Sequence, residues 1–340
     1  MAGGMTTTVA DPYGIAQDPA MPTLDQAVDP AAMQRIFDGG VAGLGPPGAI
    51  VLEAIRVVRY KPARRCLIEY DLRVGPEALT AIGKIRRNRP GHHQHRLLSA
   101  FWNGGFASDA DDGISVPEPL GRIPELALWL QRRVDGVSAT DLLADGGGAQ
   151  VAARMADAAH KIHRAGIPTH KAHAIDDELR ILTGCLASVA RSRPDLAVPL
   201  DRLARDCIRA ARRIRGLPAT GIHRDYYADQ VIVAADRLTV VDFDLYTTGD
   251  PAVDIGNLAG HIAEQALREH DDPGALADVE DAAVERYVSL AGERARDPIA
   301  LYAALTAARH VFLSHDRPER ARLVPVVLEM ARERVDRLPR

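Results

Sequence analysis

The stretch GIHRDYYADQVIV, residues 221–233, sets an aspartate two positions after a histidine and a glutamine at the mouth of a β-branched run. The run VIV, a turn at Asp236 and the apolar run LTVVDFD predict a short β-hairpin with acidic residues at its ends. Three carboxylates therefore fall within a short span: Asp225 in the loop, and Asp242 and Asp244 after the second strand.

Carboxylates at the exits of paired strands can meet, and such a pair suits phosphoryl transfer. One carboxylate accepts a hydroxyl proton and orients the nucleophile, and the other holds the magnesium ion that bridges the nucleotide phosphates. Gln230 begins the first strand, and its amide oxygen is a hard donor that could complete the metal shell. A hairpin whose acidic ends are only solvated is the alternative, because such ends are common.

The composition favours small-molecule or protein partners. The chain has 340 residues, of which 46% are hydrophobic, so it can bury one large core or two modest ones. Its net charge of −4 comes from 42 basic and 46 acidic residues mixed along the sequence, which indicates neither a nucleic acid nor an anionic membrane as partner. No stretch reaches the roughly 18 apolar residues of a membrane span. No obligate protein partner is evident.

The cysteines and the N-terminus add two expectations. Three widely spaced cysteines indicate neither a disulfide framework nor a zinc site, and they fit a reducing cytoplasm. Residues 1–28 lack a basic start followed by an apolar core, so we expect a disordered tail there rather than a signal peptide.

Residues 29–133 predict a small lobe built on a sheet. A short helix should begin after Asp29, which can cap it. Three β-rich runs, at 49–60, 66–74 and 78–87, predict an antiparallel meander. A helix over 92–106 and two further strands complete a sheet of about five strands with one helix.

Residues 138–340 predict a large helical lobe after a hinge at 134–137. The segment AQVAARMADAAHKIHRAG places apolar residues on one helical stripe, and the hairpin alone interrupts the helices that follow. Four more helical segments run from Pro251 to Arg340. The fold class is therefore α+β, with a small antiparallel sheet lobe and a large mainly helical lobe.

Two features of the small lobe are candidates for binding phosphates. Lys84 lies among apolar neighbours on a predicted strand, where it either meets a phosphate or belongs to a solvated face. The turn KPARR, with Arg64 and Arg65, could cover a polyphosphate, although it lacks the glycines that let backbone amides approach phosphate. A solvated basic hairpin tip is the alternative for this turn.

The order of these elements resembles the aminoglycoside phosphotransferase and choline kinase family, which has a protein-kinase-like fold. The resemblance spans roughly residues 45–330, and it implies an ATP-dependent phosphotransferase that uses Mg²⁺ and acts on a hydroxyl of a small molecule, such as a sugar, amino sugar, aminoglycoside or amino alcohol. The matching segments, in order, are the strand with Lys84, the hinge LWLQRRVDGVS, the loop HRDYYADQ, the run VVDFD and the run GDPAVDIGNLAGHI.

The resemblance also implies roles for residues of the helical lobe. Asp225 matches the catalytic aspartate that positions the acceptor hydroxyl, and His223 matches the histidine that packs beneath it. Asp242 matches the main magnesium ligand, and Gln230 takes the place of the usual metal-binding asparagine. Asp254 matches the aspartate that ties the catalytic loop to the helical lobe, or it is an ordinary first-turn acid favoured by the helix dipole.

In the small lobe, the resemblance implies that Lys84 holds the nucleotide phosphates. Arg64 and Arg65 would cover them, and adenine would be read by backbone groups of the hinge at 132–135, so that Arg133 also belongs to the nucleotide site. GDPAVDIGNL follows Asp242 within a few residues, which leaves no room for the activation segment of a protein kinase. A small-molecule kinase is therefore favoured.

Three departures from the family pattern keep a second interpretation open, that of a weakened or inactive kinase-fold protein that binds a ligand or partner. Gln230 is one methylene longer than asparagine, although Asp244 could supply a metal-binding oxygen instead. The helix expected at 92–106 has no acid to pair with Lys84, so Gln94 or His95 would have to replace it. The turn over the phosphates is basic rather than glycine-rich.

The acceptor should bind between Asp225 and the late helices. The acidic stretch 270–285 could attract an amine, or it is the solvated face of a helix. The stretch 307–315 contributes Arg309, His310 and His315, and an arginine there could clamp a carboxylate or phosphate of the acceptor, or it is a surface arginine of a packed helix. One of the two tyrosines after Asp225 could stack on a sugar ring, while the other belongs to the core.

Overall fold

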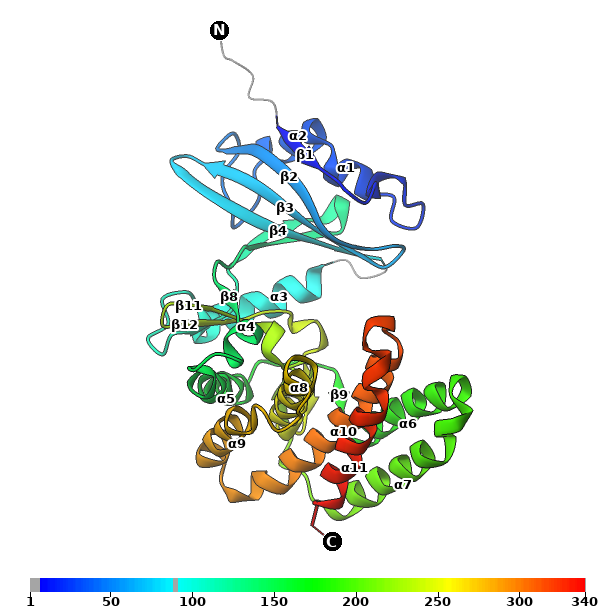
Figure 1. Ribbon diagram of the computed structural model, residues 1–340. Coiled ribbons are helices and arrows are strands. Elements are labelled where there is room, and N and C mark those ends of the chain that lie inside the picture. The colour runs from blue at the N-terminus through cyan, green and yellow to red at the C-terminus, as the bar shows by residue number, and fades with distance from the viewer. Residues whose placement is uncertain (1–6, 88–90, 340) are drawn as a thin grey trace. The chain divides into compact units, whose positions relative to one another are not determined.

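The computed structural model describes residues 7–87 and 91–339, which form two compact units (Figure 1). The first unit ends at Asp135 and the second begins at Gly136. This boundary falls inside the segment 134–137 that the sequence predicted as a hinge.

The first unit is built on one twisted sheet, whose strand order is β1-β2-β3-β4-β7-β6. The meander expected from the three β-rich runs is confirmed, because β2, β3 and β4 pair antiparallel in sequence order, and β7 and β6 continue the antiparallel pairing. The strands of this sheet are β1 Thr8–Ala10, β2 Ile50–Lys61, β3 Arg65–Val74, β4 Glu77–Arg86, β6 Pro119–Ile123 and β7 Leu128–Arg132, and the short strand β5, Ile114–Ser115, is not part of it. The expected helix is α3, His92–Phe101, and a single wider turn over Trp102–Phe106 ends it.

The N-terminal segment corrects one expectation. Residues 7–28 do not form a disordered tail: β1 adds to the sheet parallel to β2, and α1 (Leu24–Val28) packs into the core. Ile15 and Ala27 are fully buried, and the Tyr70 hydroxyl donates to the Ala27 carbonyl at 2.8 Å. The segment is ordered because it covers apolar side chains of the sheet, which its own sequence does not reveal. The rest of the predicted tail, residues 1–6, lies outside the described residues.

Helix α2, Pro30–Asp38, begins where the sequence predicted. The Asp29 carboxylate accepts a hydrogen bond from the Ala32 backbone N–H at 2.7 Å, and Pro30 occupies the first turn. Met33 and Phe37 bury one face of the helix in the core of the sheet unit.

The second unit is mainly helical, and the four helices expected after Pro251 are confirmed as α8 to α11 (Figure 1). Helix α8 lies at its centre, with nearly every residue from Ala252 to Leu267 buried, and α10 packs closely against it. The helix bounds are α4 Ala139–Leu143, α5 Gly148–Arg164, α6 Ile175–Ser192, α7 Ala197–Arg213, α8 Ala252–His270, α9 Ala277–Ala291, α10 Arg296–His315 and α11 Val324–Asp336.

Short strands position the two acidic segments within the helical unit. Strands β11 (Val231–Ala234) and β12 (Arg237–Val240) form the predicted hairpin, and β8 (Val137–Ser138) pairs with β11. The antiparallel pair β10 (Thr220–Ile222) and β13 (Thr247–Gly249) flanks the hairpin in sequence, and β9 (Ala172–His173) runs parallel to β13. The loop that carries Asp225 therefore leaves β10 and returns into β11.

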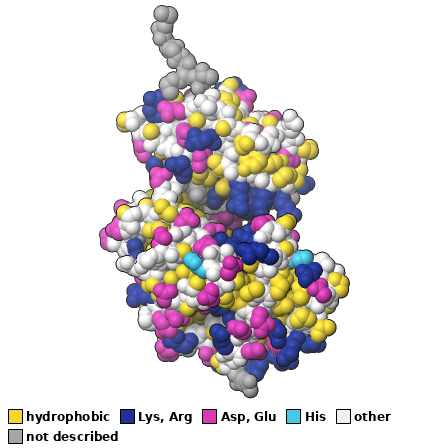
Figure 2. All heavy atoms as spheres, viewed as in Figure 1, with side chains coloured by type: hydrophobic (Ala, Val, Ile, Leu, Met, Phe, Trp, Pro, Cys, Tyr) yellow, Lys and Arg dark blue, Asp and Glu magenta, His cyan; other side chains and the backbone are white. Residues whose placement is uncertain are grey.

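The surface carries mixed charge. Figure 2 shows acidic and basic side chains interspersed on the visible face of each unit, as the mixed charges along the sequence suggested. None of the helices in the described part of the chain has the length and apolar character that a membrane crossing requires.

Candidate active site

The predicted catalytic loop, residues 223–230, is anchored at its start by His223. This side chain is fully buried, and its ring Nε2 lies 2.9 Å from the Val241 carbonyl oxygen. Its ring also packs on Phe243, with 4.9 Å between ring centroids. His223 therefore lies beneath the loop and connects it to the segment that carries Asp242.

Asp254, in the first turn of α8, holds the backbone of the same loop. Its carboxylate accepts hydrogen bonds from the backbone N–H groups of His223 (2.8 Å) and Arg224 (2.6 Å). Arg224 has a φ of 72°, in the left-handed region, so the loop bends sharply where the two N–H groups meet the carboxylate. Asp254 is fully buried, which is not how an acid that serves only the helix dipole is placed.

His163 on α5 is a residue of the candidate site that the sequence reasoning missed. Its Nε2 lies 2.8 Å from Asp254 Oδ2, and its Nδ1 lies 2.7 Å from the Tyr287 hydroxyl. The two contacts fix the imidazole on both sides, so His163 orients the carboxylate that holds the loop. The available signal was a histidine directly after Ile162, at the buried end of an otherwise apolar stripe.

Asn257, one turn after Asp254 on α8, supports the loop from the other side. Its Nδ2 donates to the Arg224 carbonyl oxygen at 2.8 Å. Its Oδ1 accepts from the Thr306 hydroxyl at 2.7 Å and from Arg309 Nη2 at 3.3 Å. Residues three apart on a helix share a face, so Asp254 and Asn257 together hold the N–H and the C=O of Arg224.

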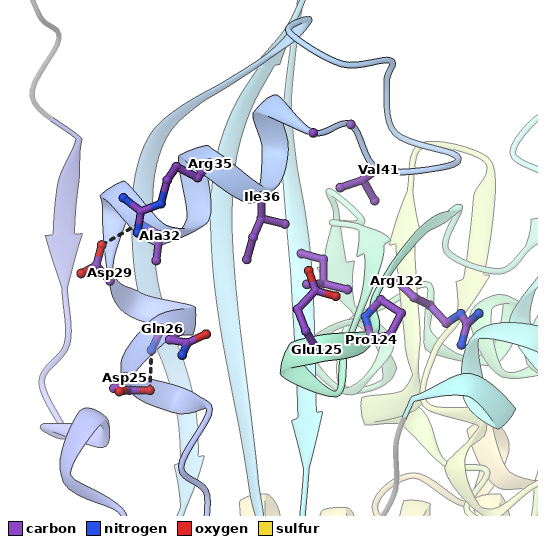
Figure 3. Close-up of a pocket in the computed structure, with 13 residues that line it drawn as sticks. Asp25, Gln26, Asp29, Ala32, Arg35, Ile36, Val41, Arg122, Pro124 and Glu125 are labelled. Carbon is purple, nitrogen blue, oxygen red and sulfur yellow. Dashed lines mark hydrogen bonds between the residues drawn. The ribbon is translucent and has the colours of Figure 1, made fainter.

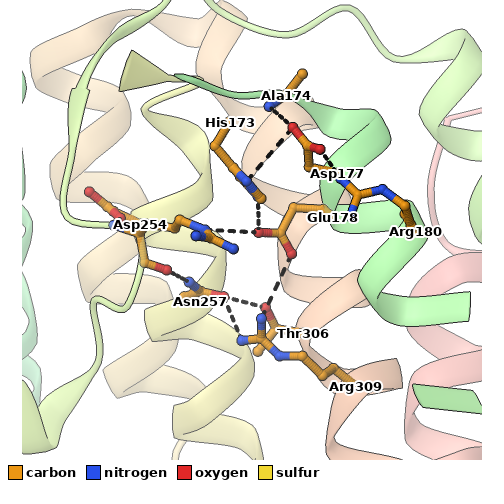
Figure 4. Close-up of polar contacts among 10 residues, drawn as sticks. His173, Ala174, Asp177, Glu178, Arg180, Asp254, Asn257, Thr306 and Arg309 are labelled. Carbon is orange, nitrogen blue, oxygen red and sulfur yellow. Dashed lines mark hydrogen bonds and ion pairs between the residues drawn. The ribbon is translucent and has the colours of Figure 1, made fainter. Parts of the chain in front are cut away.

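A buried carboxylate, Glu178 on α6, completes this network (Figure 4). Its Oε1 lies 2.6 Å from His173 Nε2, its Oε2 lies 3.7 Å from Arg309 Nη1, and Arg224 Nε lies 4.0 Å away. Burial alone would raise the pKa of Glu178, but the hydrogen bond to His173 and the charge of Arg309 leave that pKa below its usual value. Glu178 therefore stays ionised and fixes the Arg309 guanidinium.

Asp225 lines a cavity of about 320 Å³ within the helical unit. Burial raises the pKa of Asp225, the nearby carboxylate of Asp242 adds to the rise, and the positive charge of Arg309 opposes it. A carboxylate with a raised pKa is a better proton acceptor than an exposed aspartate. The cavity gives this group access to a small molecule.

The two tyrosines after Asp225 have different surroundings. Tyr226 is fully buried, and its hydroxyl donates to the Met155 carbonyl oxygen at 2.8 Å. Tyr227 lines the cavity and stacks on His261, with 4.3 Å between ring centroids and 16° between the ring planes. Tyr226 therefore belongs to the core, and Tyr227 offers an aromatic surface to the cavity.

The predicted metal ligands leave the same end of the hairpin. Val231 is paired with Val240, and the Val241 N–H donates to the Gln230 carbonyl at 2.9 Å, so Gln230 and Asp242 lie side by side. Asp242 has a left-handed backbone, and Asp244 is buried just after it.

This donor set fits Mg²⁺, because that ion takes one or two carboxylates from the protein and completes its shell with phosphates and water. Within residues 7–87 and 91–339, no three His, Cys, Asp or Glu side chains converge on one metal position. A cation held here would therefore depend on the nucleotide for part of its shell.

In the sheet unit, Lys84 is buried on β4, with 9% of the residue exposed, and its Nζ lies 5.0 Å from the centroid of the Trp129 ring. Its alternative placement on a solvated face is therefore wrong. The replacement of an acidic partner by Gln94 or His95 stays a prediction.

The basic turn is shaped by the N-terminal segment. Asp18 Oδ2 accepts from the Ala63 N–H at 2.8 Å and from the Tyr60 hydroxyl at 2.7 Å. Arg64 is exposed, and Arg65 is partly exposed at the start of β3. Arg133, by contrast, places Nη2 2.8 Å from Asp135 and Nη1 4.0 Å from Glu69. The contact of these arginines with a nucleotide stays a prediction.

A second cavity in the sheet unit, of about 840 Å³, is lined by residues of α1, α2 and the segment 122–125 (Figure 3). Its charged lining residues are of both signs, Arg35 and Arg122 beside Asp25, Asp29 and Glu125. None of the described residues that line it is among those predicted to bind nucleotide, so this cavity is separate from the predicted site.

The sequence comparison decides the family. A sequence model described as "Phosphotransferase enzyme family" matches residues 78–299, which is more than half of the chain. The chain belongs to the phosphotransferase enzyme family. This confirms the predicted family and the predicted enzyme class, a small-molecule kinase. No curated protein sequence matches the chain significantly.

Solved structures show the fold. A choline/ethanolamine kinase family protein from Mesorhizobium loti is similar with a TM-score of 0.55 and 16% identity, over 92% of this chain and 96% of that one. An amicoumacin kinase in complex with AMP-PNP, Ca²⁺ and Ami has a TM-score of 0.58 and 13% identity, over 94% and 96%. A glucosamine kinase in complex with glucosamine, ADP and inorganic phosphate has a TM-score of 0.53 and 17% identity, over 86% and 80%. The predicted kinase-like α+β fold is therefore confirmed.

Proposed function

We propose that this phosphotransferase transfers the γ-phosphoryl group of ATP to a hydroxyl of a small molecule, and that Asp225 orients that hydroxyl. The observation that carries the proposal is the position of Asp225, on a loop fixed by Asp254 and at the wall of a cavity of small-molecule size. Phosphoryl transfer depends mainly on positioning and electrostatics, so a rigidly held carboxylate is the feature it requires.

The step follows from the chemistry of Asp225. Its carboxylate accepts a hydrogen bond from the acceptor hydroxyl and takes the proton as the hydroxyl oxygen bonds to the γ-phosphorus. The bond from that phosphorus to the β,γ-bridging oxygen breaks, and ADP leaves with the bonding electrons. The raised pKa of Asp225 favours this proton transfer. A magnesium ion held by Asp242, with Gln230 and Asp244 as further oxygen donors, would neutralise charge on the phosphates.

The nucleotide belongs to the sheet unit in this proposal. Buried Lys84 would pair with phosphate oxygens, and Arg64 and Arg65 would cover them with side chains rather than backbone amides. The backbone near Arg133 would read the adenine ring. Support for ATP comes from structural neighbours that hold adenine nucleotides, AMP-PNP in the amicoumacin kinase and ADP in the glucosamine kinase. The three cysteines are free thiols, which fits the proposed location in a reducing cytoplasm.

The first test separates binding from transfer. We expect ATP with Mg²⁺ to raise the Tm of both the native protein and the Asp225→Asn variant, whereas transfer from labelled ATP falls by at least about 100-fold in the variant. Asp242→Asn should reduce the magnesium-dependent part of the Tm shift. Transfer that survives Asp225→Asn would refute the assigned role.

The alternative is a weakened or inactive kinase-fold binding protein, which Gln230 in the place of the usual asparagine favours. Gln230→Asn distinguishes the two. Under the alternative, the native protein binds ATP but transfers phosphate to no acceptor, and Gln230→Asn restores the transfer. Under the proposal, the native protein already transfers phosphate across a panel of sugars, amino sugars, aminoglycosides, amino alcohols and hydroxy acids.

A further inference from the structure

The wall of the Asp225 cavity is rich in guanidinium groups. Four arginines line it, on α8, on α10 and in the segment after α10: Arg268, Arg309, Arg317 and Arg320. We propose that the acceptor carries an anionic group, a carboxylate or a phosphate, in addition to its reacting hydroxyl, and that Arg309, Arg317 and His310 bind this group. The inference rests on the proposed function and names the class of acceptor.

Two of the four arginines are largely neutralised by the protein. Glu264 is buried, and its carboxylate lies between Arg320 (3.2 Å) and Arg268 (3.7 Å). Arg268 Nη1 also lies 3.0 Å from Glu269 Oε1. Arg268 and Arg320 therefore stabilise the cavity wall by sharing the Glu264 carboxylate, and little of their charge remains to bind a ligand.

The protein does not fully neutralise the positive charges of Arg309 and Arg317. Glu178 lies 3.7 Å from Arg309, and this carboxylate also serves His173 and Arg224, so it compensates Arg309 only in part. Arg317 is exposed and has no ion pair with any residue in the described part of the chain. Both residues line the cavity, where an anion could form charge-assisted hydrogen bonds with their guanidinium groups.

The buried ring of His310 provides a second, independent observation. It lines the cavity with 2% of the residue exposed, and neither ring nitrogen has a hydrogen-bond partner within residues 7–87 and 91–339. Buried polar atoms nearly always have partners, so we expect the His310 ring to hydrogen-bond to an oxygen of a molecule bound in the cavity. The neighbouring His261 offers only its ring face or edge, at 4.5 Å between centroids and 81° between planes.

The electrostatic potential at this wall of the cavity is positive. Burial, and then the positive charges of the four arginines, lower the pKa of His310 to about 3. The ring is therefore neutral at pH 7, with one nitrogen as a donor and the other as an acceptor. All four guanidinium groups act on this one side chain, so positive potential converges on the inner wall.

The same wall is unfavourable for a cationic acceptor. Its three carboxylates are already engaged: Asp225 is required for the hydroxyl, Glu264 is shared by two arginines, and Asp229 accepts a hydrogen bond from Thr140. None of the described residues of the acidic stretch 270–285 lines this cavity. Tyr227, which stacks on His261 and lines the cavity, adds apolar surface against which the carbon skeleton would pack.

The test compares matched acceptors. The panel pairs glycerate and glycerol 3-phosphate with glycerol, and gluconate and glucose 6-phosphate with glucose, and it includes glucosamine and ethanolamine as amines. We expect kcat/KM for at least one anionic alcohol to exceed that of its neutral counterpart by about 100-fold. The carboxylate and phosphate arms identify which anion the site takes. Binding of the same compounds to the Asp225→Asn variant, followed by calorimetry, provides a readout that does not need turnover.

Two variants locate the effect. Arg317→Gln should raise KM for the anionic acceptor about 10-fold or more while the Tm shift with ATP and Mg²⁺ stays unchanged. Arg322→Gln is the matched control, since Arg322 is exposed, follows closely in sequence and does not line the cavity. His310→Gln keeps a donor and an acceptor and should weaken calorimetric binding less than His310→Leu.

The outcomes separate the two levels of the proposal. A higher kcat/KM for neutral or amine acceptors, or no preference for anionic alcohols in turnover or in binding, overturns the anionic-acceptor inference but leaves the phosphotransferase intact. An Arg317→Gln effect equal to that of Arg322→Gln overturns the assigned position. Absence of both phosphoryl transfer and an ATP-dependent Tm shift refutes the proposed function itself.

Discussion

Replacing Asp254 removes the carboxylate that holds two consecutive backbone N–H groups of the catalytic loop. In Asp254→Ala, the N–H groups of His223 and Arg224 and the Nε2 of His163 lose their acceptor inside the protein. A buried polar group without a partner costs about 1–3 kcal/mol, so three such groups predict a loss of about 3–5 kcal/mol after some relaxation. That loss is a large part of the stability of an ordinary protein.

The Asp254→Asn variant removes only one of these hydrogen bonds. Its oxygen can replace Oδ2, which serves His223 and His163, but its amide NH₂ then faces the Arg224 N–H and one hydrogen bond is lost. We expect a loss of about 1–3 kcal/mol in the free energy of unfolding. Because the loop carries Asp225 next to Arg224, a displacement of about 1 Å would lower kcat by about 100-fold.

The measurements are urea unfolding for stability and phosphoryl transfer for kcat. Asp278→Asn is the matched control, since Asp278 is an exposed acid in the first turn of α9 and loses only a helix-dipole interaction of about 0.3–1 kcal/mol. If Asp254→Asn cost no more than Asp278→Asn and left kcat unchanged, Asp254 would be an ordinary first-turn acid and the reasoning would be refuted.

Three further predictions concern the helical unit. The pKa of His310 is about 3 in the folded protein and 6.5 in the unfolded chain, so the unfolded chain binds a proton first and stability falls as the pH drops below about 6.5. At pH 5 the expected loss in the free energy of unfolding is about 2 kcal/mol. Urea unfolding at both pH values should show a smaller loss in His310→Gln. Glu178→Gln removes the buried counter-charge of two arginines and should lower the free energy of unfolding by about 1–3 kcal/mol, measured in the same way. Gly256→Ala should lower the Tm, because the new Cβ would lie 2.4 Å from the Tyr302 Cβ and force α8 from α10. Its matched control is Gly184→Ala on α6, where the new Cβ meets nothing within 4 Å and the protein should gain up to about 1 kcal/mol in stability.

The parts of the site that are local in sequence could be predicted. The hairpin and its acidic ends follow from β-branched runs and a turn at Asp236, and the structure places Gln230 and Asp242 at one end of it. The strand that carries Lys84 and the cap at Asp29 likewise depend on a few neighbouring residues, although the alternation along that strand left open whether Lys84 is buried. These features need only the alternation of a strand or the first turn of a helix.

The parts that depend on distant partners could not be predicted. His163 and Asp254 are separated by 91 residues, and Asn257 and Thr306 by 49, so neither contact leaves a pattern in the sequence. The N-terminal segment failed for the same reason. Ile15 stands among polar and small residues without helical or strand periodicity, and its burial depends on the sheet that follows.

Arg309 links acceptor binding to the support of the catalytic loop. One side of its guanidinium is held by Glu178 and Asn257, and Asn257 also holds the Arg224 carbonyl next to Asp225. Arg309 also lines the cavity. An acceptor anion bound in this cavity would contact Arg309, which also supports the loop through Asn257. Arg309→Gln should therefore change KM for the acceptor and kcat together. Arg317 has no such contact with the loop among the described residues, so Arg317→Gln should change KM alone. If Arg309→Gln also left kcat unchanged, the loop and the acceptor site would be independent.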